Sequence, residues 1–108
     1  MIDWNRIAEL KSDLGDDGLA DLLPIFLDEI DDALTKLATQ TEASEGAAIC
    51  HFIKGSAANL GFASLAEASH AGEQAGKAGT LPPNIAKTLR DHFDAAKQEF
   101  ESHEDPSR

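Results

Sequence analysis

Apolar residues recur every three or four positions along most of this chain, a spacing that favours helices burying one face. Residues 17–40 show it most clearly, with a stripe made of Leu19, Leu23, Phe26, Ile30, Leu34 and Leu37. A helix of about 3.6 residues per turn brings such positions to one side, where they can face a core. No segment has the strict alternation of a half-buried strand. We therefore predict an all-α fold.

Capping and turn residues divide the chain into one short helix and four long ones. We expect helices over residues 3–14, 17–40, 44–60, 64–78 and 83–102. Asp3 and Ser44 are candidate N-caps, and Ser64-Leu65-Ala66-Glu67 has the form of a capping box. Gly15 and Gly61 are placed to end the helices before them. Short loops between long helices imply an antiparallel up-down four-helix bundle, with the first helix as a lid.

The length of 108 residues suits one domain with one core. We place this domain at residues 1–103 and expect 104–108 to be a frayed tail.

Pro24 lies inside the second helix and should kink it, because its ring removes the hydrogen bond to Ala20.

Charge and cysteine content exclude several classes of partner. The chain has 20 acidic and 9 basic residues and a net charge of −11, whereas nucleic acids and anionic membranes bind basic patches. No apolar run approaches the ~20 residues of a membrane span, and the first residues lack the features of a signal peptide. The single cysteine, Cys50, fits a reducing compartment. We expect a cytoplasmic monomer.

The third helix has an unusual solvent-facing side. Its core side carries Ile49, Ile53, Ser56, Ala57 and Leu60, and His51 points almost directly away from them. Around His51 lie small residues and one lysine, namely Ala47, Ala48, Lys54, Gly55 and Ala58. Gly55 is costly there, since glycine within a helix is about 0.5–1 kcal/mol less favourable than alanine. Such a surface suits the close approach of another protein, although a lone exposed histidine is often only a surface residue.

The motif His51-x-x-Lys54-Gly55-Ser56-x-x-x-x-Gly61 resembles the signature of histidine-containing phosphotransfer (HPt) domains. The segments on either side of the motif also resemble those of the family, and they lie at matching distances from it along the sequence. The similar segments are 10–15, 22–29 and 65–67 together with Glu73. The resemblance therefore covers most of residues 3–79, and the fold of the family is also a helical bundle.

The resemblance implies that His51 accepts a phosphoryl group from an aspartyl phosphate and passes it to another receiver domain. The partners would be receiver domains of response regulators or hybrid histidine kinases. Nε2 is the nitrogen expected to carry the group, with Lys54 beside the phosphoryl oxygens. Docking would use Ala47, Ala48, Gly55 and Ala58. The chain shows neither a Gly-rich nucleotide loop nor paired carboxylates beside His51, so we expect a phosphocarrier that is not an enzyme and has no cofactor.

The other histidines and the cysteine give no further site. Glu67-x-x-His70 matches half of a di-iron bundle site, but no second Glu-x-x-His exists and we expect no metal. His70, His92 and His103 are expected to be ordinary surface or boundary residues. Cys50 is expected to be a small apolar filler.

Two points about the resemblance stay open at this stage. Gly72 and Gly76 stand where the family commonly has a bulkier residue, which indicates either closer helix packing or a less stable helix. An alternative function is a bundle that binds receiver domains as a regulator or scaffold without carrying phosphate. The presence of both His51 and Lys54 argues against this alternative.

Overall fold

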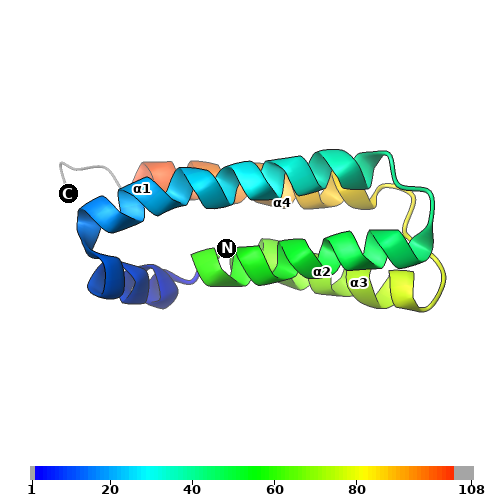
Figure 1. Cartoon of the computed structure of the whole chain (residues 1–108), viewed down its shortest axis with the longest axis horizontal. Coiled ribbons are helices and arrows are strands. Elements are labelled where there is room, and N and C mark those ends of the chain that lie inside the picture. Colours follow the sequence, from blue (N-terminus) through cyan, green and yellow to red (C-terminus); the bar gives the residue numbers. More distant parts are fainter. Residues whose placement is uncertain (1, 104–108) are drawn as a thin grey trace.

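The structure, a computed structural model, describes residues 2–103 and consists of antiparallel helices packed side by side (Figure 1). The helices are α1 (Trp4–Ala38), α2 (Ala43–Leu60), α3 (Ala63–Lys77) and α4 (Ile85–His103). No strand is present among the described residues, where the only β pairing is an isolated bridge between Ile2 and Phe62. The all-α bundle is thus confirmed. The tail predicted at residues 104–108 lies outside the described residues.

The predicted lid and the long helix after it form α1, which is broken at Gly15. Gly15 has φ 77° and ψ 166°, far from helical values, and the chain changes direction there (Figure 1). Asp3 caps the helix as predicted, because its side chain accepts hydrogen bonds from the backbone of Asn5 and Arg6. The backbone N–H of Asp3 in turn donates to the carbonyl of Gly61 at 2.6 Å. The lid is therefore joined to the end of α2.

Pro24 lies within α1 without any departure from helical dihedral angles. The kink predicted at this residue is not seen in those angles, and the change of direction falls at Gly15 instead. The reason is that the φ of proline, near about −65°, is itself compatible with a helix.

Two predicted caps are wrong. α2 begins at Ala43 and α3 at Ala63, so Ser44 and Ser64 lie inside the first turns rather than at the N-cap positions. Gly61 explains the early start of α3: as predicted it ends α2, in the left-handed conformation at φ 74°. The next residue, Phe62, is buried and occupies the N-cap position of α3. Packing of this phenyl ring therefore sets where α3 begins, in preference to the local capping signal.

The core side of α2 is close to the prediction. Ile53, Ser56, Ala57 and Leu60 are buried, while Ile49 is only partly covered. Cys50 is fully buried, and this burial raises the pKa of its thiol to about 11. It therefore fills space in the core, as expected of a buried cysteine.

Helices α2 and α3 pack closely through glycine. A Cβ atom on Gly76 would lie 2.7 Å from the carbonyl oxygen of Ala43, and one on Gly72 would lie 2.9 Å from Sγ of Cys50. The sequence alone left open whether Gly72 and Gly76 indicate closer helix packing or a less stable helix. The structure shows closer packing. This contact sets which α3 side chains lie beside His51.

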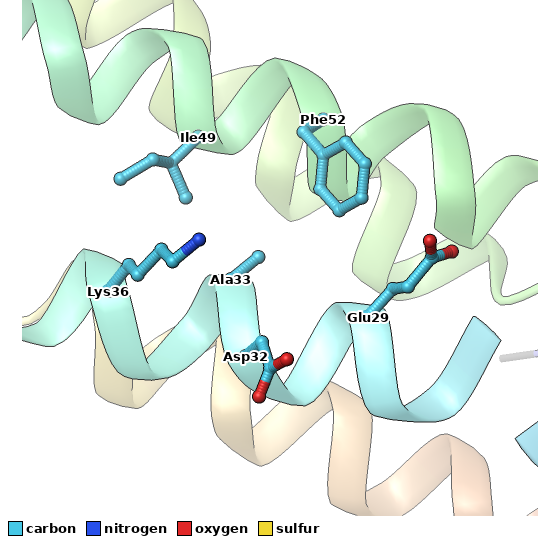
Figure 2. Close-up of a pocket in the computed structure, with 6 residues that line it drawn as sticks. All are labelled: Glu29, Asp32, Ala33, Lys36, Ile49 and Phe52. Atoms are coloured by element: carbon cyan, nitrogen blue, oxygen red, sulfur yellow. The ribbon is translucent and has the colours of Figure 1, made fainter. Parts of the chain in front are cut away.

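A hollow lies between α1 and α2, with a volume of about 290 Å³ (Figure 2). Ile49 and Phe52 of α2 face α1 across it, and Phe52 is one of the large apolar side chains that are exposed. The α1 side is formed by Glu29, Asp32, Ala33 and Lys36. This groove is apolar at its base and carries charge on its α1 side.

None of the described helices combines the length and the apolar character that crossing a membrane requires.

Candidate functional site

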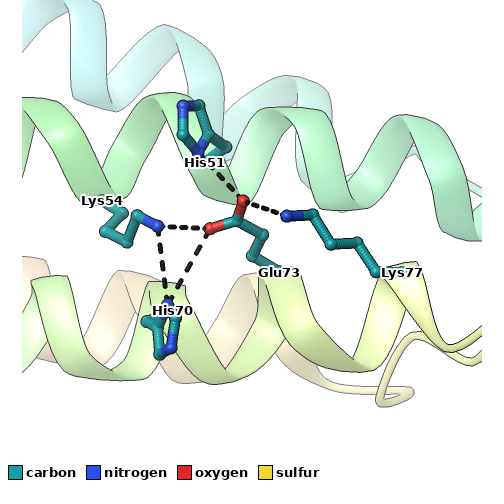
Figure 3. A network of polar contacts seen from close by, with 5 residues as sticks. All are labelled: His51, Lys54, His70, Glu73 and Lys77. Carbon is teal, nitrogen blue, oxygen red and sulfur yellow. Dashed lines mark hydrogen bonds and ion pairs between the residues drawn. The ribbon is translucent and has the colours of Figure 1, made fainter.

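His51 lies on α2 with 68% of its side chain exposed, on the side of the helix away from the core. This is the orientation that the helical spacing predicts. The neighbouring helix α3 brings a second group of polar side chains to the same place (Figure 3). These come from His70, Glu73 and Lys77, which are three or four residues apart and so share one face of α3.

Glu73 is the centre of this group. Its side chain is only 3% exposed, and its Oε2 lies 2.9 Å from Nδ1 of His51. Lys54 donates to Oε1 at 2.6 Å, and Nζ of Lys77 lies 3.1 Å from Oε2. The two lysines approach the carboxylate from opposite sides (Figure 3). A buried carboxylate is costly unless it is paired, and here two cations pair with it.

These contacts keep Glu73 ionised. The hydrogen bond from Lys54 is the largest cause, and together with those from Lys77 and His51 it outweighs burial and lowers the pKa of Glu73 to about 2. An ionised carboxylate has no proton to donate, so it accepts from Nδ1 of His51. The Nδ1–H tautomer leaves Nε2 of the neutral ring with a free lone pair. The geometry therefore prepares the outer nitrogen of an exposed imidazole as a nucleophile.

His70 lies at the edge of the same network. Its Nδ1 is 3.5 Å from Nζ of Lys54 and 4.0 Å from Oε1 of Glu73. His70 is exposed, as predicted, and in addition lies beside Lys54 and Glu73.

Sequence reasoning missed the roles of Glu73 and Lys77. Glu73 entered only as part of the similarity that flanks the motif, and Lys77 did not enter at all. One signal could have found Glu73: it shares a helical face with Leu65, Ser69, Gly72 and Gly76, all of which are buried. A carboxylate on such a face needs partners.

The small residues around His51 divide into two groups. Ala48, Gly55 and Ala58 are exposed, and no atom lies within 4 Å of a Cβ built on Gly55. Ala47 differs from the prediction of an open docking surface, because it is only 5% exposed and packs against Gly76. Close packing of α2 on α3 covers it.

A second hollow, of about 470 Å³, lies beside His51 between α2 and α3. His51, Glu73 and Lys77 provide its polar groups, and its other lining residues are small: Ser44, Ala47, Ala48 and Gly76. A reacting group bound at His51 would therefore have open space next to it on the α3 side.

Within residues 2–103, no cluster of three or more His, Cys, Asp and Glu side chains could hold a metal ion. Glu67 and His92 line a separate, shallow hollow with Ser64 and Ala68.

The family model of the Hpt domain matches residues 21–99, which include His51, Lys54 and the whole α3 group. No curated protein and no solved structure matches the chain.

Proposed function

The chain belongs to the Hpt domain family, and from this premise we propose that Nε2 of His51 carries a phosphoryl group between two receiver domains. Membership makes the chain a phosphotransfer-type module of two-component signalling, in which Hpt domains interact with receiver domains and act as phosphocarriers.

In the loading step, the Nε2 lone pair of His51 attacks the phosphorus of an aspartyl phosphate on the receiver. The bond between phosphorus and the aspartate oxygen breaks, and the carboxylate leaves with the electron pair. The N–P bond forms while Nδ1 keeps its proton, so the ring becomes positively charged. Passing the group on to a second receiver is the reverse of this step.

The contact between His51 and Glu73 is the observation that supports this chemistry best. A carboxylate 2.9 Å from Nδ1 selects the tautomer with a free Nε2 and stabilises the positive charge that the ring acquires. It does so from a buried position, where an electrostatic interaction is stronger than in water. No proton has to leave the site for the N–P bond to form.

Lys54 has two roles in the proposal. Its ammonium group, 2.6 Å from Oε1, keeps Glu73 ionised. Lys54 also lies one turn after His51 on the same helix, so its point charge can contact phosphoryl oxygens on Nε2.

Docking of the receiver involves the open surface formed by Ala48, Gly55 and Ala58. The exposed ring of Phe52 and the groove that it forms with α1 extend this surface (Figure 2). Ala47 contributes only at the edge of the hollow on the α3 side. Small residues let the backbone of the receiver approach within reach of His51, since misplacing reacting groups by ~1 Å can cost on the order of a hundredfold in rate.

Incubation with a labelled, phosphorylated receiver domain tests the proposal. Label should appear on this chain in a form that is labile in acid and stable in base, as a phosphoramidate is. It should then move to a second, unlabelled receiver. A chain that binds receivers but never becomes labelled would be the regulator or scaffold described above, and the proposal would be wrong.

A further inference from the structure

The two lysines that contact Glu73 differ in how firmly they are held. Lys54 is 29% exposed and lies close to both Glu73 and His70. Lys77 is 62% exposed, and the one contact described for its ammonium group is with Oε2 of Glu73, at the longer distance of 3.1 Å. The carboxylate of this pair is buried, but most of the Lys77 side chain is in solvent, so its ammonium group is readily hydrated when it leaves Oε2. Lys77 is therefore the cation that can leave at low cost.

Oε2 of Glu73 also connects Lys77 to the reacting residue, because this oxygen is the one that contacts Nδ1 of His51. The ammonium group of Lys77 thus lies beside the imidazole although the two residues come from different helices. A phosphoryl group on Nε2 would lie further from Glu73 than Nδ1 does, by about the width of the imidazole ring. The flexible side chain of Lys77 can extend its ammonium group over this distance.

The hollow between α2 and α3 provides the space for this movement. Lys77 lines it together with His51, and the other residues around the opening are alanine, glycine and serine. No bulky side chain among these lining residues blocks the path from Glu73 towards the imidazole. Close packing at Gly76, where a Cβ would meet the backbone of Ala43, keeps the two helices at this short separation.

Charge balance gives the reason for a movement. The unloaded site has one carboxylate and two ammonium groups, and a phosphoryl dianion adds two negative charges to it. The positively charged ring then satisfies Oε2 of Glu73 by itself, so the phosphoryl oxygens become the better partner for Lys77.

We propose that Lys77 is a second phosphoryl-binding residue, which leaves Glu73 and contacts the phosphoryl oxygens once His51 is loaded. Lys54 keeps its contact with Oε1 of Glu73 in both states, and its ammonium group also reaches the phosphoryl oxygens once His51 is loaded. This inference rests on the proposed function in that His51 must be the residue that carries the group.

The test loads His51 without any receiver, by using phosphoramidate as a small-molecule phosphoryl donor. The ³¹P NMR signal of the phosphohistidine is then followed as a function of pH. A cation in contact with the oxygens favours the dianion, so Lys77→Met should shift the midpoint to higher pH. The expected shift is about 0.3 to 0.7 pH unit, a two- to fivefold change, since the contact is partly exposed.

Lys87 provides a matched control. It is an exposed lysine with an i,i+4 ion pair to Asp91, just as Lys77 has one to Glu73. Lys87→Met should leave the midpoint of the phosphohistidine titration unchanged. Lys77→Arg, which keeps the positive charge, should have a midpoint close to that of the wild type. Thermal melts of the unloaded variants check that each remains folded.

Two results would overturn the inference. One is a Lys77→Met variant whose phosphoryl group titrates like the wild type. The other is a change of the His51 tautomer in unloaded Lys77→Met, measured from imidazole ¹⁵N shifts, because Lys77 would then act through Glu73.

The proposed relay function can be contradicted without contradicting the inference about Lys77. If the loaded protein shows the expected shift but exchanges its phosphoryl group with no receiver, the contact with Lys77 stands and the relay role does not. A wild-type protein in which His51 is loaded neither by phosphoramidate nor by a phosphorylated receiver would contradict both proposals.

Discussion

Oε2 of Glu73 lies 2.9 Å from Nδ1 of His51, although the two residues are on different helices and 22 positions apart in the sequence. The carboxylate is buried and the imidazole is exposed. The contact therefore lets an inaccessible charge control the tautomer of an accessible ring. Exposure leaves His51 accessible to another protein, and in the proposed function the contact with Glu73 leaves Nε2 of His51 free to react.

Replacing His51 with glutamine should abolish labelling by a phosphorylated receiver. Glutamine keeps the size and polarity of the side chain but has no nucleophilic nitrogen lone pair. The measurement is the transfer of label at equal protein concentration, with a binding assay to show that the receiver still docks. Label on the variant would mean that another residue accepts the phosphoryl group.

Lys54→Ala should remain folded, because the side chain lies off the apolar face of α2. The transfer rate should fall about ten- to a hundredfold, since a charge-assisted contact is worth about 1.5–3 kcal/mol. Rapid-quench kinetics with a saturating receiver measure this rate. Lys87→Ala, which removes an exposed lysine of α4 that lines neither hollow, is the control. An unchanged rate with unchanged receiver affinity would remove Lys54 from the site.

Gly55→Leu should keep or raise the melting temperature while slowing transfer sharply. A side chain at this position would stand in open space, because nothing lies within 4 Å of a Cβ there. Replacing a glycine within a helix also removes a cost of about 0.5–1 kcal/mol. The bulk of leucine, however, would keep the receiver away from His51.

The contrasting variant for Gly55 is Gly76→Ala. Its Cβ would lie 2.7 Å from the Ala43 carbonyl oxygen and 2.8 Å from Cβ of Ala47, so α2 and α3 would have to separate. Gly76→Ala should therefore lower the melting temperature. If Gly55→Leu unfolds the protein instead, Gly55 is a packing residue and the docking surface must be redrawn.

Glu73 should make the stability of the fold depend on pH in acid. Its pKa falls from the usual 4.5 to about 2 in the folded state, chiefly through the hydrogen bond from Lys54. A group whose pKa is lowered by folding contributes stability above its unfolded pKa. This contribution is therefore full above about pH 4.5 and is lost as the pH falls towards 2.

Urea unfolding of the wild type and of Glu73→Gln, repeated at pH 6, 5, 4 and 3, measures this dependence. The difference in free energy of unfolding between the two proteins should shrink as the pH falls. Glu67→Gln, an exposed carboxylate on the same helix, serves as the control and should show no such trend. A difference that stays constant down to pH 3 would show that Glu73 is not held ionised by its partners.

Much of this protein was determined by local sequence signals. The apolar spacing defines the helices, and the same spacing places His51 opposite Ile53 and Leu60, because the angle between residues on one helix depends on the helix alone. Asp3, Gly15 and Gly61 act within a few residues of their own positions, and the structure confirms each of them. The motif around His51, together with flanking segments at matched spacing, indicated the family that the comparison then showed.

The partners of His51 were decided only by tertiary structure. Whether Glu73 contacts His51 depends on the rotation and separation of α3 relative to α2, and these follow from packing at Gly72 and Gly76 rather than from any local pattern. The same contact buries Ala47, which helical spacing alone placed on the open surface. Burial of Phe62 likewise overrides the serine cap predicted for α3. A helical pattern specifies which side of one helix is apolar, but the meeting of two side chains from different helices depends on how closely their backbones can approach.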